Sequence, residues 1–278
     1  MNAKTEELVA NLNDQVAALV TGDDWKAALD FQARLHKYSF NNTMLIRFQR
    51  PDATVVGGMK SLWNKVGRHV IKGEHGIAIL APLTAKRTDP DTGESKYVFT
   101  GHYRTVYVFD VKQTEGEPLT ALDILHPVDL EGEAPADVAA NIIEQVESYG
   151  YSYKTDPGLI GALKGYTEPT SKKVVVQASM SPLAQLKTSV HELAHIALGH
   201  VDKDFDYRSC RGVAEVEAES VAYVVCAALN LPTDDYSFAY VGGWSEGNLD
   251  LVKKTGERVA RIAKGILAKF EEKEEVAA

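Results

Sequence analysis

The spacing of apolar residues changes along residues 1–112 from that of helices to that of strands. Residues 4–49 have helical spacing, and Asp23 or Asp24 is suited to cap a helix that begins near Trp25. Residues 77–80 form an apolar run typical of a buried strand, and TDPDTGES after them has the composition of a hairpin tip. The segment YVFTGHYRTVYVFDV then predicts one or two strands rich in aromatic residues and Val. The pattern therefore predicts an α+β region.

The rest of the chain has mostly helical periodicity. One strong strand, KKVVVQAS, is predicted at residues 172–179. Helices are predicted over four ranges: 136–150, 181–198, 213–229 and 248–272. Residues 126–137, HPVDLEGEAPAD, are rich in Pro, Gly and acidic residues and form the candidate linker. We therefore predict an α+β protein of two domains, an α+β domain over residues 1–125 and a mostly helical domain over residues 138–278.

The composition is that of a folded protein with a core. Of the 278 residues, 45% are hydrophobic and 25% are charged, which separates the chain from disordered sequences. No apolar run approaches the length of about 18 residues that a membrane helix needs, so we expect no membrane partner. The N-terminus lacks the features of a signal peptide, and Cys210 and Cys226 form no disulfide framework. These features predict a cytoplasmic protein.

Charge is unevenly distributed along the chain. The net charge of −9 argues against a simple nucleic-acid binder. Residues 25–112, however, hold 14 basic and 7 acidic residues, whereas residues 113–278 hold 15 basic and 27 acidic residues. This asymmetry suggests two regions with different partners.

The central chemical motif is HELAH at residues 191–195. On a helix, His191 and His195 lie on one face, so both imidazoles can reach one ion. Glu192 projects beside them, where it can accept a proton from a water molecule during hydrolysis. The motif stands in the apolar stretch LKTSVHELAHIAL, where such polar groups are costly to bury without a partner. It therefore predicts a zinc-dependent hydrolase.

The third metal ligand has to come from elsewhere in the chain. His200 is five residues after His195, whereas a metzincin would need a His six residues on. The acidic cluster Glu215, Glu217 and Glu219 follows, on a helix that is almost wholly apolar from residue 221 onward. Glu215 and Glu219 share a face at i, i+4, and Glu217 points away from it. In Glu-liganded zincins the first acid of such a pair binds the metal, and the second supports a ligand His.

Five stretches of the chain together resemble the ArdC family of antirestriction proteins. They are SLWNKVGRHVIKGEHGIAIL (61–80), VYVFDVKQTEG (106–116), SVHELAHIALGH (189–200), EVEAESVAYVVCAALNL (215–231) and YVGGW (240–244). Members of this family pair an N-terminal single-stranded-DNA-binding domain with a C-terminal zincin-like metallopeptidase domain. The metallopeptidase half also resembles the ImmA/IrrE group.

The resemblance implies roles for individual residues. His191, His195 and Glu215 would hold Zn²⁺, Glu192 would be the general base, and the support of a ligand His falls to Glu219. The Tyr-x-x-x-Trp position of the family falls on Tyr240 and Trp244, and Tyr240 would either donate to a developing oxyanion or be a core aromatic.

Single-stranded DNA is the partner that the resemblance implies for the N-terminal domain. Binding of this kind needs cations for phosphates and flat side chains for bases. The candidates, whose aromatics are more often core residues than stacking platforms, are Arg34, Lys37, Tyr38, Trp63, Lys65, Arg68 and Lys72.

Three functions are compatible with these motifs. The first is a DNA-associated zinc metallopeptidase of the ArdC type, whose protein substrate the sequence does not identify. The second is an antirestriction or strand-protecting protein that binds single-stranded DNA and has a non-proteolytic metal domain. The third is a regulatory protease of the ImmA/IrrE type that cleaves a repressor.

Overall fold

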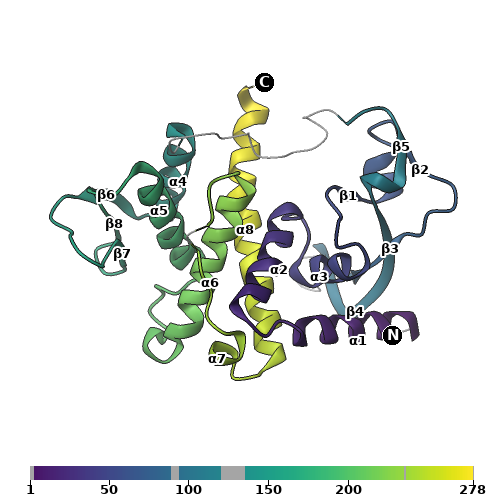
Figure 1. Ribbon diagram of the computed structural model, residues 1–278, viewed down its shortest axis with the longest axis horizontal. Helices are drawn as coiled ribbons and strands as arrows, with labels where there is room; N and C mark the ends of the chain where they lie inside the picture. The colour runs from purple at the N-terminus through teal and green to yellow at the C-terminus, as the bar shows by residue number, and fades with distance from the viewer. Residues whose placement is uncertain (1–2, 89–93, 120–134, 235, 278) are drawn as a thin grey trace. The chain divides into compact units, whose positions relative to one another are not determined.

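The protein has a mixed α+β fold, as the sequence predicts. The computed structural model describes residues 3–88, 94–119, 135–234 and 236–277. The chain divides into two compact units: unit 1 holds residues 1–18 and 41–124, and unit 2 holds residues 19–40 and 125–278 (Figure 1). None of the described helices is long and apolar enough to cross a membrane.

Unit 1 is built around a long antiparallel hairpin. Strands β3 (Ile77–Thr88) and β4 (Ser95–Asp110) pair from Ile77↔Val108 to Thr88↔Ser95, with a bulge between Pro82 and Thr84. The short strand β1 (Val56–Gly57) pairs with the other edge of β4, which gives the order β1-β4-β3. A second pair joins β2 (Arg68–Val70) to β5 (Thr114–Gly116). The one-turn helices η1 (Met59–Trp63) and η2 (Val111–Gln113) lie in the connections.

Helix α3 (Phe40–Gln49) covers the outer edge of β3 with side-chain amides. The Asn42 amide donates to the carbonyl of Leu80 and accepts from its N–H, both at 2.9 Å. Gln49 makes the same two bonds with Ala78, also at 2.9 Å. These pairs satisfy backbone groups that an edge strand otherwise leaves open. Helix α1 (Ala3–Ala17) packs on β3 and β4 and completes the unit.

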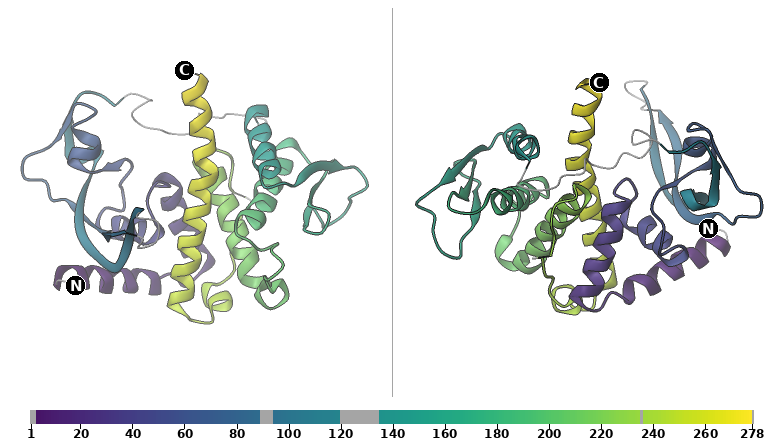
Figure 2. Two further views of the ribbon diagram at one scale, coloured as in Figure 1. Left: turned by 180° about the vertical axis from the view of Figure 1, so that it is seen from behind. Right: turned by 45° about the horizontal axis from the view of Figure 1, so that its top comes forward.

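Unit 2 is mostly helical with one small sheet. In that sheet β8 (Lys173–Gln177) lies between β6 (Ser152–Asp156), to which it is parallel, and β7 (Gly165–Glu168), to which it is antiparallel. The helices are α2 (Gly22–Arg34), α4 (Ala136–Ser148), α5 (Pro182–Ala197), α6 (Tyr207–Ala228), α7 (Val241–Ser245) and α8 (Leu249–Ala277). Helix α6 packs against α2, α5 and α8 (Figure 2).

Helix α2 belongs to unit 2 through its buried face. Thr21 caps the helix, and Asp24 completes a capping box. Trp25 is fully buried and donates from Nε1 to the hydroxyl of Ser220 on α6 at 2.9 Å. Burial of so large an aromatic side chain is a major part of this helix contact.

The structure differs from the expected elements in two places. The expected strand at residues 172–179 belongs to a sheet of three strands. The sequence pattern does not predict its two neighbours, because β6 and β7 are short and have weak apolar alternation. The helix expected from residue 213 begins at Tyr207. The expected linker, residues 126–137, lies mostly outside the described residues, and the predicted domain boundaries remain a prediction. The compact units divide the chain differently, because residues 19–40 pack in unit 2.

Candidate metal centre

Helix α5 places two imidazoles one turn apart. It begins after Ser181, whose hydroxyl accepts from the N–H of Ala184 at 3.3 Å, and Pro182 occupies a first-turn position, where its missing N–H costs nothing. Residues four apart share a helix face, so His191 and His195 point to one side. Their Nε2 atoms lie 3.1 Å apart.

Helix α6 brings one carboxylate to this pair. Glu215 Oε2 lies 3.5 Å from His191 Nε2 and 3.9 Å from His195 Nε2. In a tetrahedral site with metal–ligand bonds of about 2.0–2.1 Å, ligand atoms are ~3.3 Å apart. The three atoms therefore form a triangle of the size that one ion spans. Within the described part of the chain, His191, His195 and Glu215 form the group of potential metal ligands whose ligand atoms lie close enough together to hold one ion.

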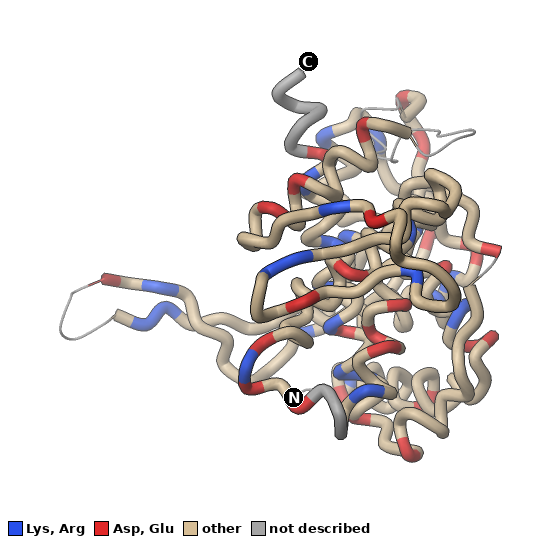
Figure 3. The backbone as a smooth tube through the Cα atoms, turned by 90° about the vertical axis from the view of Figure 1, so that its left-hand side faces the viewer, with Lys and Arg blue, Asp and Glu red and all other residues tan. Residues whose placement is uncertain are grey.

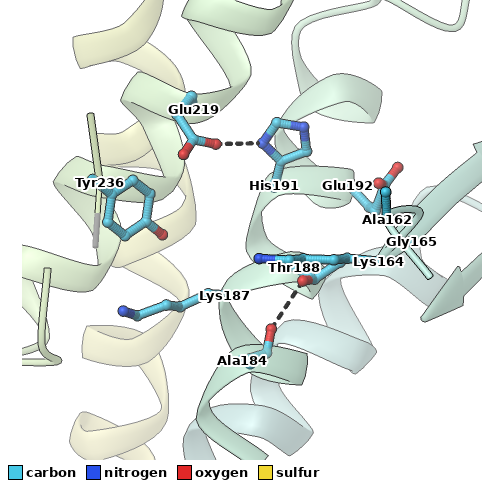
Figure 4. Close-up of a pocket in the computed structure, with 10 residues that line it drawn as sticks. All are labelled: Ala162, Lys164, Gly165, Ala184, Lys187, Thr188, His191, Glu192, Glu219 and Tyr236. Atoms are coloured by element: carbon cyan, nitrogen blue, oxygen red, sulfur yellow. Dashed lines mark hydrogen bonds and ion pairs between the residues drawn. The ribbon is translucent and has the colours of Figure 1, made fainter. Parts of the chain in front are cut away.

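The outer ring nitrogens of both imidazoles also have partners. His191 Nδ1 lies 3.0 Å from Glu219 Oε2, as the sequence-based support role requires (Figure 4). His195 Nδ1 lies 3.0 Å from Nδ1 of His200, which follows the end of α5. Such partners fix the ring orientation of a ligand His.

Glu192 lies beside the triad and is 7% exposed. Its Oε2 accepts a 2.7 Å hydrogen bond from the hydroxyl of Thr167 on β7. Burial raises the pKa of the Glu192 carboxyl above its ordinary value, against the opposing effects of the Thr167 hydrogen bond and the His191 charge. No sequence pattern singles out Thr167, because β7 is remote in the chain from α5 and has little alternation.

A cavity of about 290 Å³ opens in front of these groups. His191, Glu192 and Glu219 form one wall, and Lys164 and Lys187 lie at its other sides (Figure 4). The cavity therefore gives a ligand direct access to the candidate base and to one candidate ligand.

The electrostatics of the triad favour a cation. Burial alone lowers the pKa of His191, but the carboxylates of Glu215 and Glu219 outweigh it and raise this pKa to about 10. Burial and the neighbouring charge of His191 lower the pKa of His195 to about 3. The carboxylates that favour a proton on His191 equally favour a metal cation there.

The structure does not bring Tyr240 to this cavity. Tyr240 precedes α7 and is 60% exposed, and the cavity is lined instead by Tyr236, which is buried. The expected oxyanion role of Tyr240 therefore has no geometric support. Tyr236 was not among the sequence candidates.

Three of the proposed DNA-binding residues lie in unit 2 and have partners inside it. The guanidinium of Arg34 lies 4.7 Å from the ring centre of Phe31. Lys37 forms a 3.2 Å ion pair with Glu271. Tyr38 is half-buried, and burial raises its pKa to about 12.

The other four proposed DNA-binding residues lie in unit 1. Trp63 is fully buried and donates to the carbonyl of Phe109 at 3.1 Å, so it is a core residue and offers no stacking face. Arg68 is half-buried and donates to the carbonyl of Thr114 at 2.8 Å. Lys65 and Lys72 are exposed.

An exposed row of aromatic side chains on β4 was not among the candidates. Successive even steps along a strand place side chains on one face. The residues of this aromatic row are Tyr97 (74% exposed), Phe99 (49%), Tyr103 (41%) and Tyr107 (45%). The rings of Phe99 and Tyr103 are in contact at 5.1 Å, and the ammonium of Lys4 lies 5.0 Å from the Tyr107 ring.

Basic side chains lie on both faces of the hairpin. All residues of β3 and β4 are described, and they include one acidic side chain, the buried Asp110. The basic side chains of these strands are Lys86, Arg87, Lys96 and Arg104. Lys86 pairs with Tyr97 and shares the face of the row, whereas the other three alternate to the opposite face. Figure 3 shows the hairpin as an arm with basic positions along it.

The chain is similar to ArdC proteins. Residues 2–111 match the N-terminal domain of anti-restriction factor ArdC. The crystal structure of antirestriction ArdC from the R388 plasmid without metal has a TM-score of 0.53 at 22% identity, over 82% of this chain and 84% of that one. Its Mn(II)-bound structure has a TM-score of 0.51 at 19% identity, over 84% and 83%. The expected resemblance to ArdC is therefore confirmed.

An uncharacterised protein of Bacillus anthracis is also similar. It is 24% identical over 266 residues, which cover 84% of this chain and 45% of the relative. The chain thus spans about half the length of this curated relative.

Proposed function

Because this chain carries the ArdC N-terminal domain over residues 2–111 and has the fold of ArdC, we propose that it is an antirestriction protein of the ArdC type. In this proposal unit 2 contains a zincin-like metallopeptidase site, and unit 1 binds single-stranded DNA. The two activities rest on separate groups of residues.

The observation that supports the peptidase is the triangle of His191, His195 and Glu215, with sides of 3.1, 3.5 and 3.9 Å. Two His and one Glu are a ligand set of catalytic zinc sites, which keep a further position open for water or substrate. We therefore propose Zn²⁺ as the resident ion. The R388 protein has been crystallised with Mn(II), so manganese is the alternative to measure against zinc.

The residues around the triangle are suited to hydrolysis of a peptide bond. A bound divalent cation supplies Lewis acidity, which acidifies water and polarises a carbonyl group. Glu192 accepts the proton of the attacking water and returns it to the leaving amine. Its raised pKa suits both steps, because a carboxyl nearer neutrality both takes and releases a proton. The Thr167 hydroxyl holds the Glu192 carboxylate in place.

The observation that supports DNA binding is the aromatic row on β4. Exposed rings in a line offer stacking surfaces to successive bases, and neighbouring basic side chains attract the phosphates. Lys86 pairs in register with Tyr97, and Lys4 lies over Tyr107, so cations lie beside both ends of the row. We propose this face, together with exposed Lys65 and Lys72, as the contact with single-stranded DNA.

One experiment tests the whole proposal with full-length protein. The metal content is measured, and casein and a repressor are offered as substrates with and without a single-stranded oligonucleotide. Cleavage by wild type but not by Glu192→Gln supports the peptidase. A wild type that binds metal and DNA but cleaves neither substrate under any condition favours the strand-protecting alternative. Cleavage of the repressor without any DNA binding favours the ImmA/IrrE alternative.

A further inference from the structure

A row of polar side chains, buried except at its outer end Arg258, continues from His195 away from the cavity. His195 Nδ1 lies 3.0 Å from Nδ1 of His200, and Nε2 of His200 lies 2.9 Å from Oε2 of Glu217. Nε of Arg258 lies 2.9 Å and 3.1 Å from the two carboxylate oxygens of Glu217. We call these four side chains the buried relay.

Four elements of unit 2 hold the buried relay together. His195 lies on α5, Glu217 on α6 and Arg258 on α8, and His200 lies in the turn after α5 (Figure 1). Gly199 has a φ of +77°, the left-handed conformation that ends a helix, and the N–H of His200 returns to the carbonyl of His195 at 2.9 Å. The turn thus aims the His200 ring back at the His195 ring.

The middle of the buried relay is closed to solvent. The side chain of His200 is 0% exposed, and that of Glu217 is 6% exposed. A carboxylate at this depth is costly unless it is both paired and hydrogen-bonded. If Glu217 served only to join α6 to α8 through a salt bridge, Arg258 would be a sufficient partner for it. The His200 ring is an additional partner that connects the pair to a candidate metal ligand.

The two ends of the buried relay fix the direction of its hydrogen bonds. Arg258 only donates and the Glu217 carboxylate only accepts, so Nε2 of His200 carries a proton and donates to Glu217. A neutral His200 then has a lone pair at Nδ1, which accepts from Nδ1–H of His195. His195 is left with its own lone pair at Nε2, the atom that faces His191 and Glu215.

We propose that His200 and Glu217 are positioning residues that hold His195 in the tautomer and ring orientation required of a metal ligand. The proposal rests on the proposed metal site. His191 receives the equivalent support directly from Glu219 at 3.0 Å, whereas His195 receives it from Glu217 through an intervening imidazole. Loss of an outer partner of this kind typically weakens metal binding about 10- to 100-fold.

The test compares zinc affinities of full-length apoproteins by competition with a chelator of known affinity. Glu217→Gln keeps the side-chain size but turns an NH₂ group toward either Arg258 or His200. His200→Phe removes both ring nitrogens and leaves the pair of Glu217 and Arg258 intact. We expect both variants to bind Zn²⁺ about 10- to 100-fold more weakly than wild type. Glu147→Gln, at an exposed position of α4, is the matched control and should bind like wild type.

Two further readouts separate positioning from a general loss of structure. The melting temperature of each apoprotein reports whether the variant folds. Two-dimensional ¹H–¹⁵N spectra of zinc-loaded wild type report which ring nitrogen carries each proton, and should place it on Nδ1 of His195 and on Nε2 of His200.

Each outcome decides the proposal. Folded variants with weakened zinc binding support it. Zinc affinities equal to wild type in both variants overturn the relay and leave the metal site standing, whereas a wild type that binds no zinc overturns both. If Glu217→Gln does not fold, His200→Phe and the wild-type spectrum decide, and a proton on Nε2 of His195 overturns the proposal.

Discussion

The hydroxyl of Thr167 donates a 2.7 Å hydrogen bond to Oε2 of Glu192, which ties strand β7 to the candidate base on α5. The approach of strand to helix depends on Gly165. A Cβ at this position would lie 2.6 Å from Cγ2 of Thr188 and 3.1 Å from the carbonyl oxygen of Val175. The glycine therefore lets β7 lie close enough to α5 for Thr167 to reach the carboxylate.

Replacement of Thr167 by Val keeps the shape of the side chain and removes the donor. A hydrogen bond to a charged group contributes about 1.5–3 kcal/mol, so we expect kcat/KM for casein to fall about 10- to 100-fold. The zinc content should not change, because the Thr167 hydroxyl donates to Glu192 and not to a candidate ligand. Thr167→Ser, which keeps the hydroxyl, should retain most of the activity. Equal activity of the Val variant and wild type would show that this contact does not orient the base.

The Glu192→Gln variant should bind zinc like wild type and cleave no substrate. Gln has nearly the same shape but cannot accept the proton of water. Metal analysis and a casein assay on one preparation measure both properties. Retention of cleavage would exclude Glu192 as the base.

Substitutions in the acidic cluster of α6 should separate a ligand from its supports. We expect about one zinc per wild-type chain, and Glu215→Ala should lose most of it, as should His191→Ala. Glu219→Ala should bind zinc about 10- to 100-fold more weakly, because it removes the partner of His191 Nδ1. The sequence places Glu217 on the opposite face and predicts almost no effect, but its contacts with His200 and Arg258 lead us to expect weakened binding. Elemental analysis after dialysis against a weak chelator ranks the variants.

Alanine substitutions in the aromatic row should weaken binding of an oligo-dT probe by full-length protein. Stacking contributes about 1–3 kcal/mol per base, so Phe99→Ala and Tyr103→Ala should each lower the affinity at least about fivefold. Fluorescence anisotropy at several salt concentrations measures this effect and the slope expected from counterion release. Tyr149→Ala, an equally exposed aromatic that directly follows α4, is the control. Binding that is unchanged by both row variants would exclude the row as the contact.

Charge reversal offers a second comparison for the same surface. Reversal at exposed Lys65 and Lys72 of unit 1 should weaken DNA binding more than reversal at Lys253 and Lys254 of α8. The same anisotropy assay applies, and the opposite ranking would place the contact in unit 2.

Ser220→Ala should destabilise unit 2. The indole N–H of fully buried Trp25 donates to this hydroxyl at 2.9 Å and would lose its partner. An unsatisfied buried donor costs about 1–3 kcal/mol, which urea denaturation can measure as a decrease in the free energy of unfolding. Ser148→Ala, at an exposed position, should have little effect.

The sequence predicts most of the candidate metal centre because each pair of its residues is set by local helical spacing. Four-residue spacing on a helix places His191 and His195 together, and the same spacing assigns Glu215 and Glu219 to one face. The buried relay depends instead on a turn and on contacts among three helices. The spacing of His200 bears only on whether it is a metal ligand. Helical phase rotates Glu217 away from Glu215 but does not show what packs on that other side of α6.

The aromatic residues show the same limit. A sequence pattern does not say whether an aromatic ring faces the core or solvent. Trp63 on η1, a candidate for stacking on DNA, is buried. The row on β4 was predicted only as strand, since its exposure follows from how far the hairpin extends beyond the rest of the sheet. Likewise, the helical pattern of residues 22–34 does not show that α2 packs on α6.

The position of α2 has a consequence for the inheritance of this protein. A gene segment that encodes only residues 135–278 would lack Trp25, and Ser220 on α6 would face an empty place in the helical core. Recombination at the junction near residue 125 therefore cannot transfer a complete unit 2 to another protein. The two units are interleaved in the chain, so an exchange that preserves both of them has to carry the N-terminal coding region as well.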